Sequence, residues 1–521
     1  MISMPRRFRW TLPLATALVF AGVASCGSVL TLRRQLLPPS AASSVSPQST
    51  YLKAHMRSGD LYILSGWQLD SVARTVTGTG HRLDRNRRQD SSARHVLPLD
   101  SVALFESNVV VPHGSIAALA VISIASATVT AACLANPKAC FGSCPTFYVG
   151  DSATSMLEAE GFSASVAPAL EATDIDALYR ARPTSRRFSV RMTNEALETH
   201  VVRWVRLMAA ERPPGGRVFA TQSGDFWSAS TVAAPTRCES ADGDCLGTVR
   251  DLDGAERFSL ADSTDLATRE VIELEFPEFD GDTIGLVIGS RQTLLSTFLL
   301  YQTLAYMGRE ASAWLAALER HDGLRGRANA LGRILGGIEV QAKDKRGRWR
   351  TVGETWETGP LATDVRVVPL HGLPAGAKHL RLRLTRGNWR IDYVALARLN
   401  ARLHPRVLDP VRVTRRGVEN ANALELLRAG DTTRALVTFP GDEFLLEYEL
   451  PERFADHELF LQSRGYYLEW MRAEWLAEEN PARAVSMFRN PARAMRDLAP
   501  AFKKQEAGME QAFWNSRYAP R

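Results

Sequence analysis

Hydrophobic and polar residues alternate along much of the chain with the two-residue period of β-strands. The run Leu380–Leu384 places three leucines on one side and two arginines on the other, which is typical of a strand with one buried face. Short runs of this kind, separated by turn residues, recur between residues 51 and 111 and between residues 147 and 290. The pattern predicts a mainly β protein with helical segments, in which a small N-terminal β meander or barrel precedes β-sandwich modules.

The clearest β unit extends from Ile338 to Leu396. Its strands are short and evenly spaced, and a turn at Lys345–Gly347 separates the first two. This spacing predicts a jelly-roll β-sandwich of the galactose-binding type. Arg381 and Arg383 would form a basic outer face, which favours a solvated surface or contact with anionic lipid or polysaccharide.

Two regions depart from the β pattern. Residues 291–320 carry apolar side chains at helical spacing, and Gly308 would divide them into two helices. Near the C-terminus, Asn480-Pro481 and Asn490-Pro491 each combine an N-cap residue with proline at the first helical position. They predict two short helices within a helical C-terminal tail.

The first residues have the pattern of an export signal. Three arginines precede fifteen uncharged residues, and that run ends directly before Cys26. The small residues before Cys26 resemble the bacterial lipobox, so we expect cleavage there and lipid attachment to Cys26. The alternative is an ordinary signal peptide cut near Ala24. Removal of this segment lowers the net charge from +6 to +3. The residue after Cys26 is Gly27 and not aspartate, so the sequence shows no signal for retention in the inner membrane.

Residues 115–135 contain no charged side chain and are long enough to cross a membrane as a helix. Because alanine, serine and threonine dominate, the segment favours a buried or surface-packed position over a membrane-embedded helix.

The complete predicted organisation has seven parts. They are a lipoprotein signal peptide (1–25), a Pro/Ser-rich tether (26–50), a small β domain (51–111), a hydrophobic helix (112–138), a β-rich domain with a long apolar helix (139–330), a jelly-roll-like domain (331–455) and a helical tail (456–521).

The cysteines other than Cys26 are expected to form disulfides in an exported protein. Cys238 and Cys245 bracket a hydrophilic Asp-Gly turn, which predicts a disulfide between them. Because five cysteines cannot all pair within the chain, at least one thiol is expected to stay free or to pair outside it.

Cys140 and Cys144 form a CxxxCP pattern, which is similar to the copper and thiol-redox motif of the Sco copper-chaperone family. The residues after Pro145 read as a strand, whereas the Sco motif lies on a strand-to-helix turn. The sequence therefore favours a structural disulfide, between Cys140 and Cys144 or from one of them to Cys133, over a copper or thiol-redox site.

Motifs for the common hydrolases, nucleotide-binding loops and calcium sites are absent from the sequence. His200 and His457 lie next to acids, Glu198 and Glu458, which are interpreted as surface polar groups. Asp174 and Asp176 could ligate a hard cation, although turn chemistry accounts for them. The arginine cluster at residues 82–88 and the Arg381/Arg383 face do not indicate nucleic acid as a partner.

Several stretches carry a resemblance to known proteins. One set is similar, in order and spacing, to the β-rich C-terminal region of bacterial exported proteins with tetratricopeptide or FG-GAP repeats; its members are Thr193–His200, Val205–Leu207, Trp349–Val352, Trp389–Tyr393 and Phe439–Asp442. Cys140–Tyr148 and Gly465–Arg472 look similar to uncharacterised bacterial envelope lipoproteins. The resemblance implies a β-sandwich envelope module and carries over no catalytic residue.

Together these observations predict a lipid-anchored bacterial cell-envelope protein, facing the periplasm or the surface, that binds or scaffolds without catalysis. A glycan or an envelope protein is the expected partner, besides the membrane that holds the lipid anchor. The alternative is a periplasmic thiol-redox or copper-handling protein that uses Cys140 and Cys144. A hydrolase assembled from dispersed residues is a third, weaker hypothesis.

Overall fold

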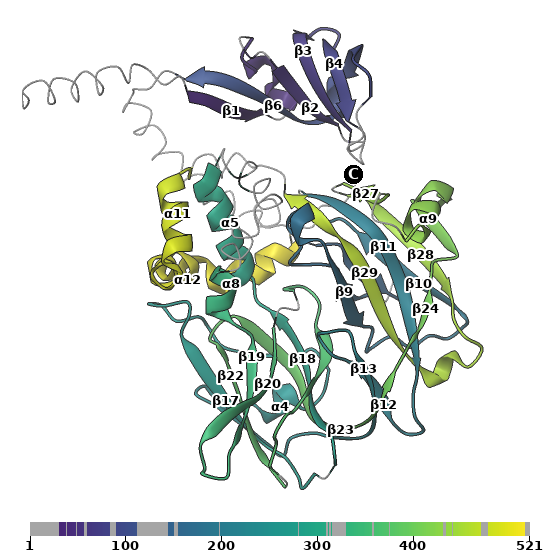
Figure 1. Ribbon diagram of the computed structural model, residues 1–521, viewed down its shortest axis with the longest axis vertical. Helices are drawn as coiled ribbons and strands as arrows, with labels where there is room; N and C mark the ends of the chain where they lie inside the picture. The colour runs from purple at the N-terminus through teal and green to yellow at the C-terminus, as the bar shows by residue number, and fades with distance from the viewer. Residues whose placement is uncertain are drawn as a thin grey trace, which may run out of the picture. The chain divides into compact units, whose positions relative to one another are not determined.

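The computed structural model describes most of the chain from residue 31 to residue 515 (Figure 1). The described residues are 31–37, 39–47, 49, 51–56, 60–83, 90–111, 144–150, 155–196, 198–279, 281–308, 311, 314, 330–356, 359–374, 376–430, 434–439, 441–469 and 478–515. They belong to two compact units, residues 1–124 and 125–521. The prediction of a mainly β protein with β-sandwich modules and C-terminal helices is confirmed.

The first unit is a six-stranded antiparallel sheet, sheet A. Its strands in spatial order are β1 (Thr31–Leu37), β6 (Val102–Val111), β2 (Tyr51–Met56), β3 (Leu61–Asp70), β4 (Thr75–Leu83) and β5 (Ala93–Pro98), with the short 3-10 helices η1 (Pro39–Ser44) and η2 (Leu99–Ser101). Strands β2 to β5 form the predicted meander, and buried Leu52, Leu64, Val76 and Phe105 form the core of this unit.

The predicted tether at 26–50 is wrong over its described residues. Strand β1 pairs with β6 along its whole length, from Thr31 opposite Val111 to Leu37 opposite Phe105. Ala42 and Val45, which follow in the Pro/Ser-rich stretch, are buried in the core of the same unit. The composition suggested a flexible linker, but these two apolar side chains and a ladder of backbone hydrogen bonds hold the segment in the fold.

The described residues of the second unit form four sheets. Sheet B has the order β26 (Val418–Glu419), β25 (Arg412–Arg415), β28 (Glu443–Glu449), β10 (Arg187–Thr193), β7 (Thr146–Val149) and β8 (Met156–Glu160). Sheet C has the order β24 (Arg406–Leu408), β11 (Glu198–Glu211), β29 (His457–Glu469) and β9 (Ala172–Ala177), and β27 (Leu436–Thr438) also pairs with β11. Two further 3-10 helices are η3 (Pro168–Leu170) and η5 (Phe454–Asp456).

Sheets D and E complete the unit. Sheet D has the order β13 (Phe226–Ala233), β12 (Arg217–Ala220), β21 (Asp364–Pro369), β18 (Ile284–Gln292), β23 (Trp389–Leu403) and β16 (Arg257–Phe258); β13 also pairs with β23, which closes five of these strands into a ring. Sheet E has the order β15 (Gly243–Asp244), β14 (Arg237–Ser240), β17 (Arg269–Glu275), β22 (His379–Thr385), β19 (Ile338–Lys343) and β20 (Trp349–Thr355).

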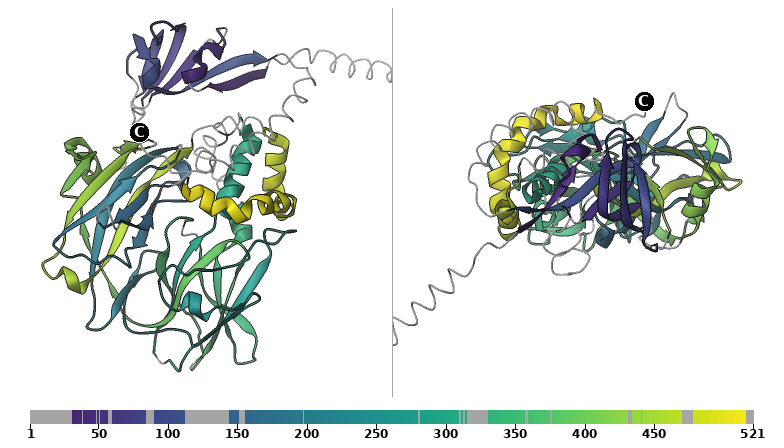
Figure 2. Two further views of the ribbon diagram at one scale, coloured as in Figure 1. Left: turned by 180° about the vertical axis from the view of Figure 1, so that it is seen from behind. Right: turned by 90° about the horizontal axis from the view of Figure 1, so that it is seen from above.

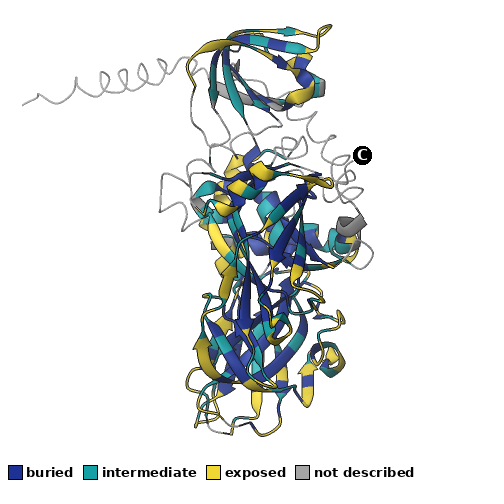
Figure 3. Ribbon diagram, turned by 90° about the vertical axis from the view of Figure 1, so that its right-hand side faces the viewer, coloured by how far each residue is buried: buried dark blue, intermediate teal, exposed yellow. Residues whose placement is uncertain are grey.

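Apolar layers lie between sheets B and C, between C and D, and between D and E. Figure 3 shows the corresponding band of buried strands through the second unit, with exposed residues at its margins. Sheet C contributes Phe460 to the layer shared with sheet D, and sheet E contributes Leu382 to the layer on the other side of sheet D. Sheet E therefore has one buried face and one face directed to solvent.

The chain order of these sheets corrects the predicted domain boundaries. All strands of sheets D and E lie between residues 217 and 403, whereas sheets B and C combine residues 146–211 with residues 406–469. One β-sandwich is therefore inserted into another. The boundaries at 330/331 and 455/456 are wrong because strand pairing joins the segments on either side of each one, as in the pairing of β18 with β21 and of β11 with β29.

Helices α5 (Leu295–Met307), α8 (Ala330–Leu335), α11 (Pro481–Arg489) and α12 (Pro491–Asn515) share one apolar core. Figure 2 shows α5 and α11 beside each other from a second direction. The shorter helices α4 (Leu246–Val249) and α9 (Ala421–Arg428) pack against sheets. Asn480 and Asn490 cap α11 and α12 as predicted, since their side chains accept hydrogen bonds from the N–H groups of Arg483 and Arg493.

The helix predictions need three corrections. Residues 291–292 belong to strand β18, so the apolar helix begins at Leu295 and ends before Gly308. The second of the two predicted short helices, α12, is a long helix that continues through Pro500. The predicted helical tail at 456–521 begins with strand β29, because its alternating apolar residues pair with β11.

Several predictions fall on residues outside those described. These include the signal segment with Cys26, the uncharged run at 115–135, Cys133 and Cys140. Among the helices of the described residues, none is both long enough and apolar enough to cross a membrane.

Candidate functional site

The solvent face of sheet E carries one tryptophan beside two cations. Strand register places Lys343 directly opposite Trp349 and Gln341 opposite both Thr351 and Arg381. The Trp349 ring lies 5.1 Å from the Lys343 ammonium and 4.4 Å from the Arg381 guanidinium carbon, within the range of cation–π attraction. We call Lys343, Gln341, Trp349 and Arg381, together with the hairpin turn 344–348, the Trp349 face.

Hydrogen bonds hold the polar side chains of this face in fixed orientations. Arg381 donates from Nε to Gln341 Oε1 at 2.7 Å, and Gln341 Nε2 donates to Glu339 Oε2 at 2.9 Å. Glu339 also accepts from Arg383 Nη1 at 2.7 Å. Gln341 is only 8% exposed, so its amide orients Arg381 from below, whereas Arg381 and Arg383 keep further N–H donors for solvent or a ligand. The sheet thus presents oriented guanidinium groups beside an aromatic ring.

The hairpin between β19 and β20 is strongly basic. Residues 343–350 contain five lysines and arginines and a single acid, Asp344, so their net charge is +4. Asp344 accepts hydrogen bonds from the backbone N–H groups of Arg346 and Arg348, both at 2.9 Å. These bonds lower the pKa of Asp344 and show that its carboxylate organises the turn. Within the part of the chain that the structure describes, Lys343, Lys345 and Arg346 form no ion pair with a carboxylate.

The solvent face of sheet B has a different charge pattern. Its arginines are matched by carboxylates across the strands, as in the pairs of Arg191 with Glu443 at 3.4 Å and Arg412 with Glu447 at 3.2 Å. On sheet E, acids gather on β17, where Glu273 lies opposite Arg381. The excess of positive charge therefore lies at the turn end of β19 and β20, because Glu339 and Glu354 face each other at the other end of this strand pair.

The sequence identified part of this site. The alternation in β22 placed Arg381 and Arg383 on one face, and the structure confirms that they point away from the buried leucines of the strand. Trp349 and the basic turn were missed as a site, although five cations within eight residues were visible in the sequence. Their juxtaposition with Arg381 depends on the pairing of β19 with β22, which are separated by β20 and β21 in the chain.

The predicted disulfide between Cys238 and Cys245 is present. The disulfide joins strand β14 to the start of α4, and both cysteines are buried in the core between sheets D and E. Cys144 is also buried, directly before β7, and Thr146–Val149 form the strand expected after the CxxxCP pattern. Cys140 lies outside the described residues, so the pairing of Cys144 and the copper hypothesis stay predictions.

His200 and Glu198 correct the surface interpretation. Both are buried, and His200 Nε2 lies 2.7 Å from Glu198 Oε1. The cross-strand neighbour of His200 is Tyr467, whose pKa burial raises well above its ordinary value, with Cys144 and Glu198 among the nearby groups that add to the rise. His457 is partly exposed and contacts the carbonyl of Arg453 at 2.9 Å.

Asp174 and Asp176 also differ from expectation, because they lie in strand β9 and not in a turn. Their charged neighbours are Asp364, Arg366 and Glu160, from β21 and β8. Burial raises the pKa of Asp174, and it raises the pKa of Asp176 still further above its ordinary value with the help of the neighbouring carboxylates. Arg366 donates to Asp174 at 3.3 Å and to Asp364, whereas Asp176 Oδ2 has no hydrogen-bond partner.

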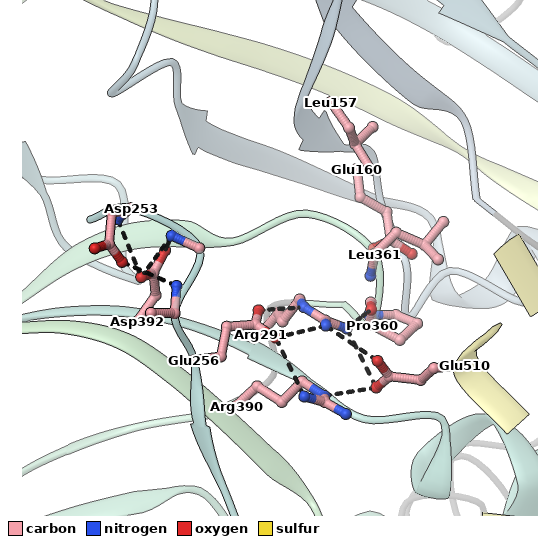
Figure 4. A network of polar contacts seen from close by, with 12 residues as sticks. Leu157, Glu160, Asp253, Glu256, Arg291, Pro360, Leu361, Arg390, Asp392 and Glu510 are labelled. Carbon is pink, nitrogen blue, oxygen red and sulfur yellow. Dashed lines mark hydrogen bonds and ion pairs between the residues drawn. The ribbon is translucent and has the colours of Figure 1, made fainter. Parts of the chain in front are cut away.

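A second polar network joins α12 to the inserted sandwich (Figure 4). Arg291 pairs with Glu256 at 2.6 Å and with Glu510 at 3.2 Å. Arg390 pairs with Glu510 at 2.7 Å and with Glu256 at 3.4 Å. The two guanidinium groups and the two carboxylates form a closed ring without net charge. Through Glu510, these ion pairs attach helix α12 to sheet D, and each of the four charged groups has an oppositely charged partner.

An open groove of about 780 Å³ lies at the end of sheets B and C beside strand β24. Its lining includes carboxylates that arginines already engage. Glu449 lies 2.9 Å from Arg186, and Glu211 lies 3.9 Å from Arg453. A third carboxylate of the lining, Asp409, pairs with Arg206 at 2.9 Å.

Comparison with known proteins gives no family assignment: no model of a protein family matches this chain, and no curated protein matches it significantly. Among the described residues, no three His, Cys, Asp or Glu side chains are grouped so that they could hold a metal ion.

Proposed function

We propose that the protein is a lipid-anchored component of a bacterial cell envelope that binds another envelope component without catalysis. The export pattern and Cys26 support the location. The Trp349 face supports the proposed binding of another envelope component, because it combines an aromatic ring, oriented hydrogen-bonding groups and cations without carboxylate partners on a sheet. Rigid strands hold such a face in a defined geometry more exactly than loops would.

Mass spectrometry of the mature protein tests the anchor. We expect the chain to start at Cys26 with acyl groups on its sulfur and amino group, and the Cys26→Ser variant to lose them. An unacylated chain that starts at another residue would contradict the proposed anchoring.

Sedimentation with purified envelope fractions tests binding separately from anchoring. For this test we use the folded protein beginning after residue 29, so that retention depends on its surface and not on acyl chains. We expect it to sediment with envelope material, and we expect Trp349→Ala to weaken that retention. The absence of retention on any envelope fraction would refute the binding function.

A further inference from the structure

We infer that the Trp349 face binds an anionic polysaccharide. The inference rests on the proposed function, since it names the class of ligand for the same face. Three features of the described residues support it: the sign of the charge, the chemistry around the ring, and the composition of the hairpin.

The charge of the face favours an anion. Asp344 is the one acid of the hairpin, and the turn and two arginines share its carboxylate: Arg348 at 3.2 Å and Arg350 at 3.4 Å. Lys343, Lys345 and Arg346 then remain without a carboxylate partner in the described residues. Unpaired cations on a projecting turn produce a positive potential that attracts a polyanion.

The surroundings of the ring favour a sugar as the carrier of that negative charge. A pyranose ring has an apolar C–H face and a rim of hydroxyl groups, and an aromatic side chain offers a flat apolar surface of matching size. Trp349 is half-buried, which leaves part of its ring accessible. Arg381 lies beside it and offers a planar guanidinium that its hydrogen bond to the buried Gln341 amide holds in place. Hydroxyls and carboxylates of a uronic acid are suitable partners for this guanidinium.

The composition of the hairpin disfavours insertion into a lipid bilayer. Peripheral insertion requires apolar side chains at the tip of the contacting element. The tip here, residues 344–347, consists of aspartate, lysine, arginine and glycine, and the tryptophan lies on the flat sheet behind it. A polymer lying across the sheet would contact both the ring and the basic turn, whereas an inserted membrane contact would require apolar residues at the tip.

Affinity electrophoresis and titration calorimetry with the same protein beginning after residue 29 test the inference. The probes are sodium alginate as a polyuronate, dextran as a neutral polysaccharide, and vesicles of phosphatidylcholine with phosphatidylglycerol. We expect binding to alginate that weakens with added salt, and no binding to dextran. Trp349→Ala should weaken alginate binding at least about tenfold, as expected for the central aromatic residue of a contact. The combined change of Lys343, Lys345 and Arg346 to glutamine should also weaken it about tenfold and reduce its salt dependence.

Matched variants control for folding and for total charge. Trp356→Ala removes another exposed tryptophan of the same sandwich. A triple change of the exposed Arg250, Arg489 and Lys504 to glutamine removes the same charge elsewhere. Both controls should keep the affinity of the unmodified protein.

Each remaining outcome has one meaning. Alginate binding that survives Trp349→Ala and the hairpin triple change overturns the assignment of the site. Binding to the anionic vesicles but not to alginate overturns the polysaccharide and identifies a lipid headgroup as the ligand. If the protein is retained on envelope fractions but does not bind alginate, this inference is refuted and the proposed function stands. If the protein binds neither envelope fractions nor alginate, the proposed binding function is refuted as well.

Discussion

Replacing Asp176 by asparagine should stabilise the second unit at neutral pH. Asp176 is only 1% exposed, and one of its carboxylate oxygens has no hydrogen-bond partner. Burial and the nearby carboxylates Asp174, Asp364 and Glu160 raise its pKa well above the ordinary value of 3.8, against the opposing effect of Arg366. The folded protein therefore holds a proton that the unfolded chain releases as the pH rises.

The sign and slope of the effect follow from this proton. Below the ordinary pKa both states are protonated, and the residue contributes nothing to the pH dependence. Between that value and the raised folded-state pKa, the free energy of unfolding falls by up to about 1.4 kcal/mol for each pH unit. Asp176→Asn removes this loss, so the variant's advantage should grow with pH across that window and then stay constant.

Urea unfolding followed by tryptophan fluorescence at several pH values measures this advantage. Asp344→Asn serves as a control, because the pKa of Asp344 is shifted in the direction opposite to that of Asp176. Hydrogen bonds from backbone N–H groups lower the pKa of Asp344, so its contribution is present above its ordinary pKa and is lost as the pH falls through the lowered one. A constant stability difference between Asp176→Asn and the unmodified protein at every pH would refute the reasoning about the buried carboxylate.

Three further changes test other features. Glu510→Gln should destabilise the docking of α12 by about 2 to 3 kcal/mol, because it leaves two largely buried guanidinium groups with one carboxylate; hydrogen exchange of α12 measures this, and Asp497→Asn on the exposed side of the helix should change little. Joint replacement of Cys238 and Cys245 by serine should lower the free energy of unfolding by about 2 kcal/mol, the low value expected for a short loop; unchanged thermal unfolding would contradict it. Val45→Asp should unfold the first unit, as measured by its circular dichroism transition, whereas a true tether would tolerate the charge.

The sequence predicts local features of this protein well. The alternation in Leu380–Leu384, the two Asn-Pro helix starts and the Cys238–Cys245 turn each depend on residues close together in the chain. Their physical causes, a buried face, an N-cap and a short loop, can be recognised without knowledge of distant partners.

Features that depend on distant pairing were missed. His200 looks like a surface residue next to Glu198, but strand β29 covers it with Tyr467. Asp174 and Asp176 resemble turn residues, yet β9 places them against Asp364 of the inserted sandwich. The binding face was found only in part for the same reason, since Arg381 and Trp349 meet through the register of three strands.

The insertion of one sandwich into the other also constrains the order in which the chain can fold. As the chain emerges with its N-terminus first, every strand of the inner sandwich, from β12 to β23, arrives before β24, so this sandwich can complete its hydrogen bonds early. Strand β11 has all its partners, β24, β27 and β29, on the late side of that insertion. Its fourteen residues therefore emerge as a long strand with both edges open, and they stay exposed to aggregation until residues 406–469 arrive.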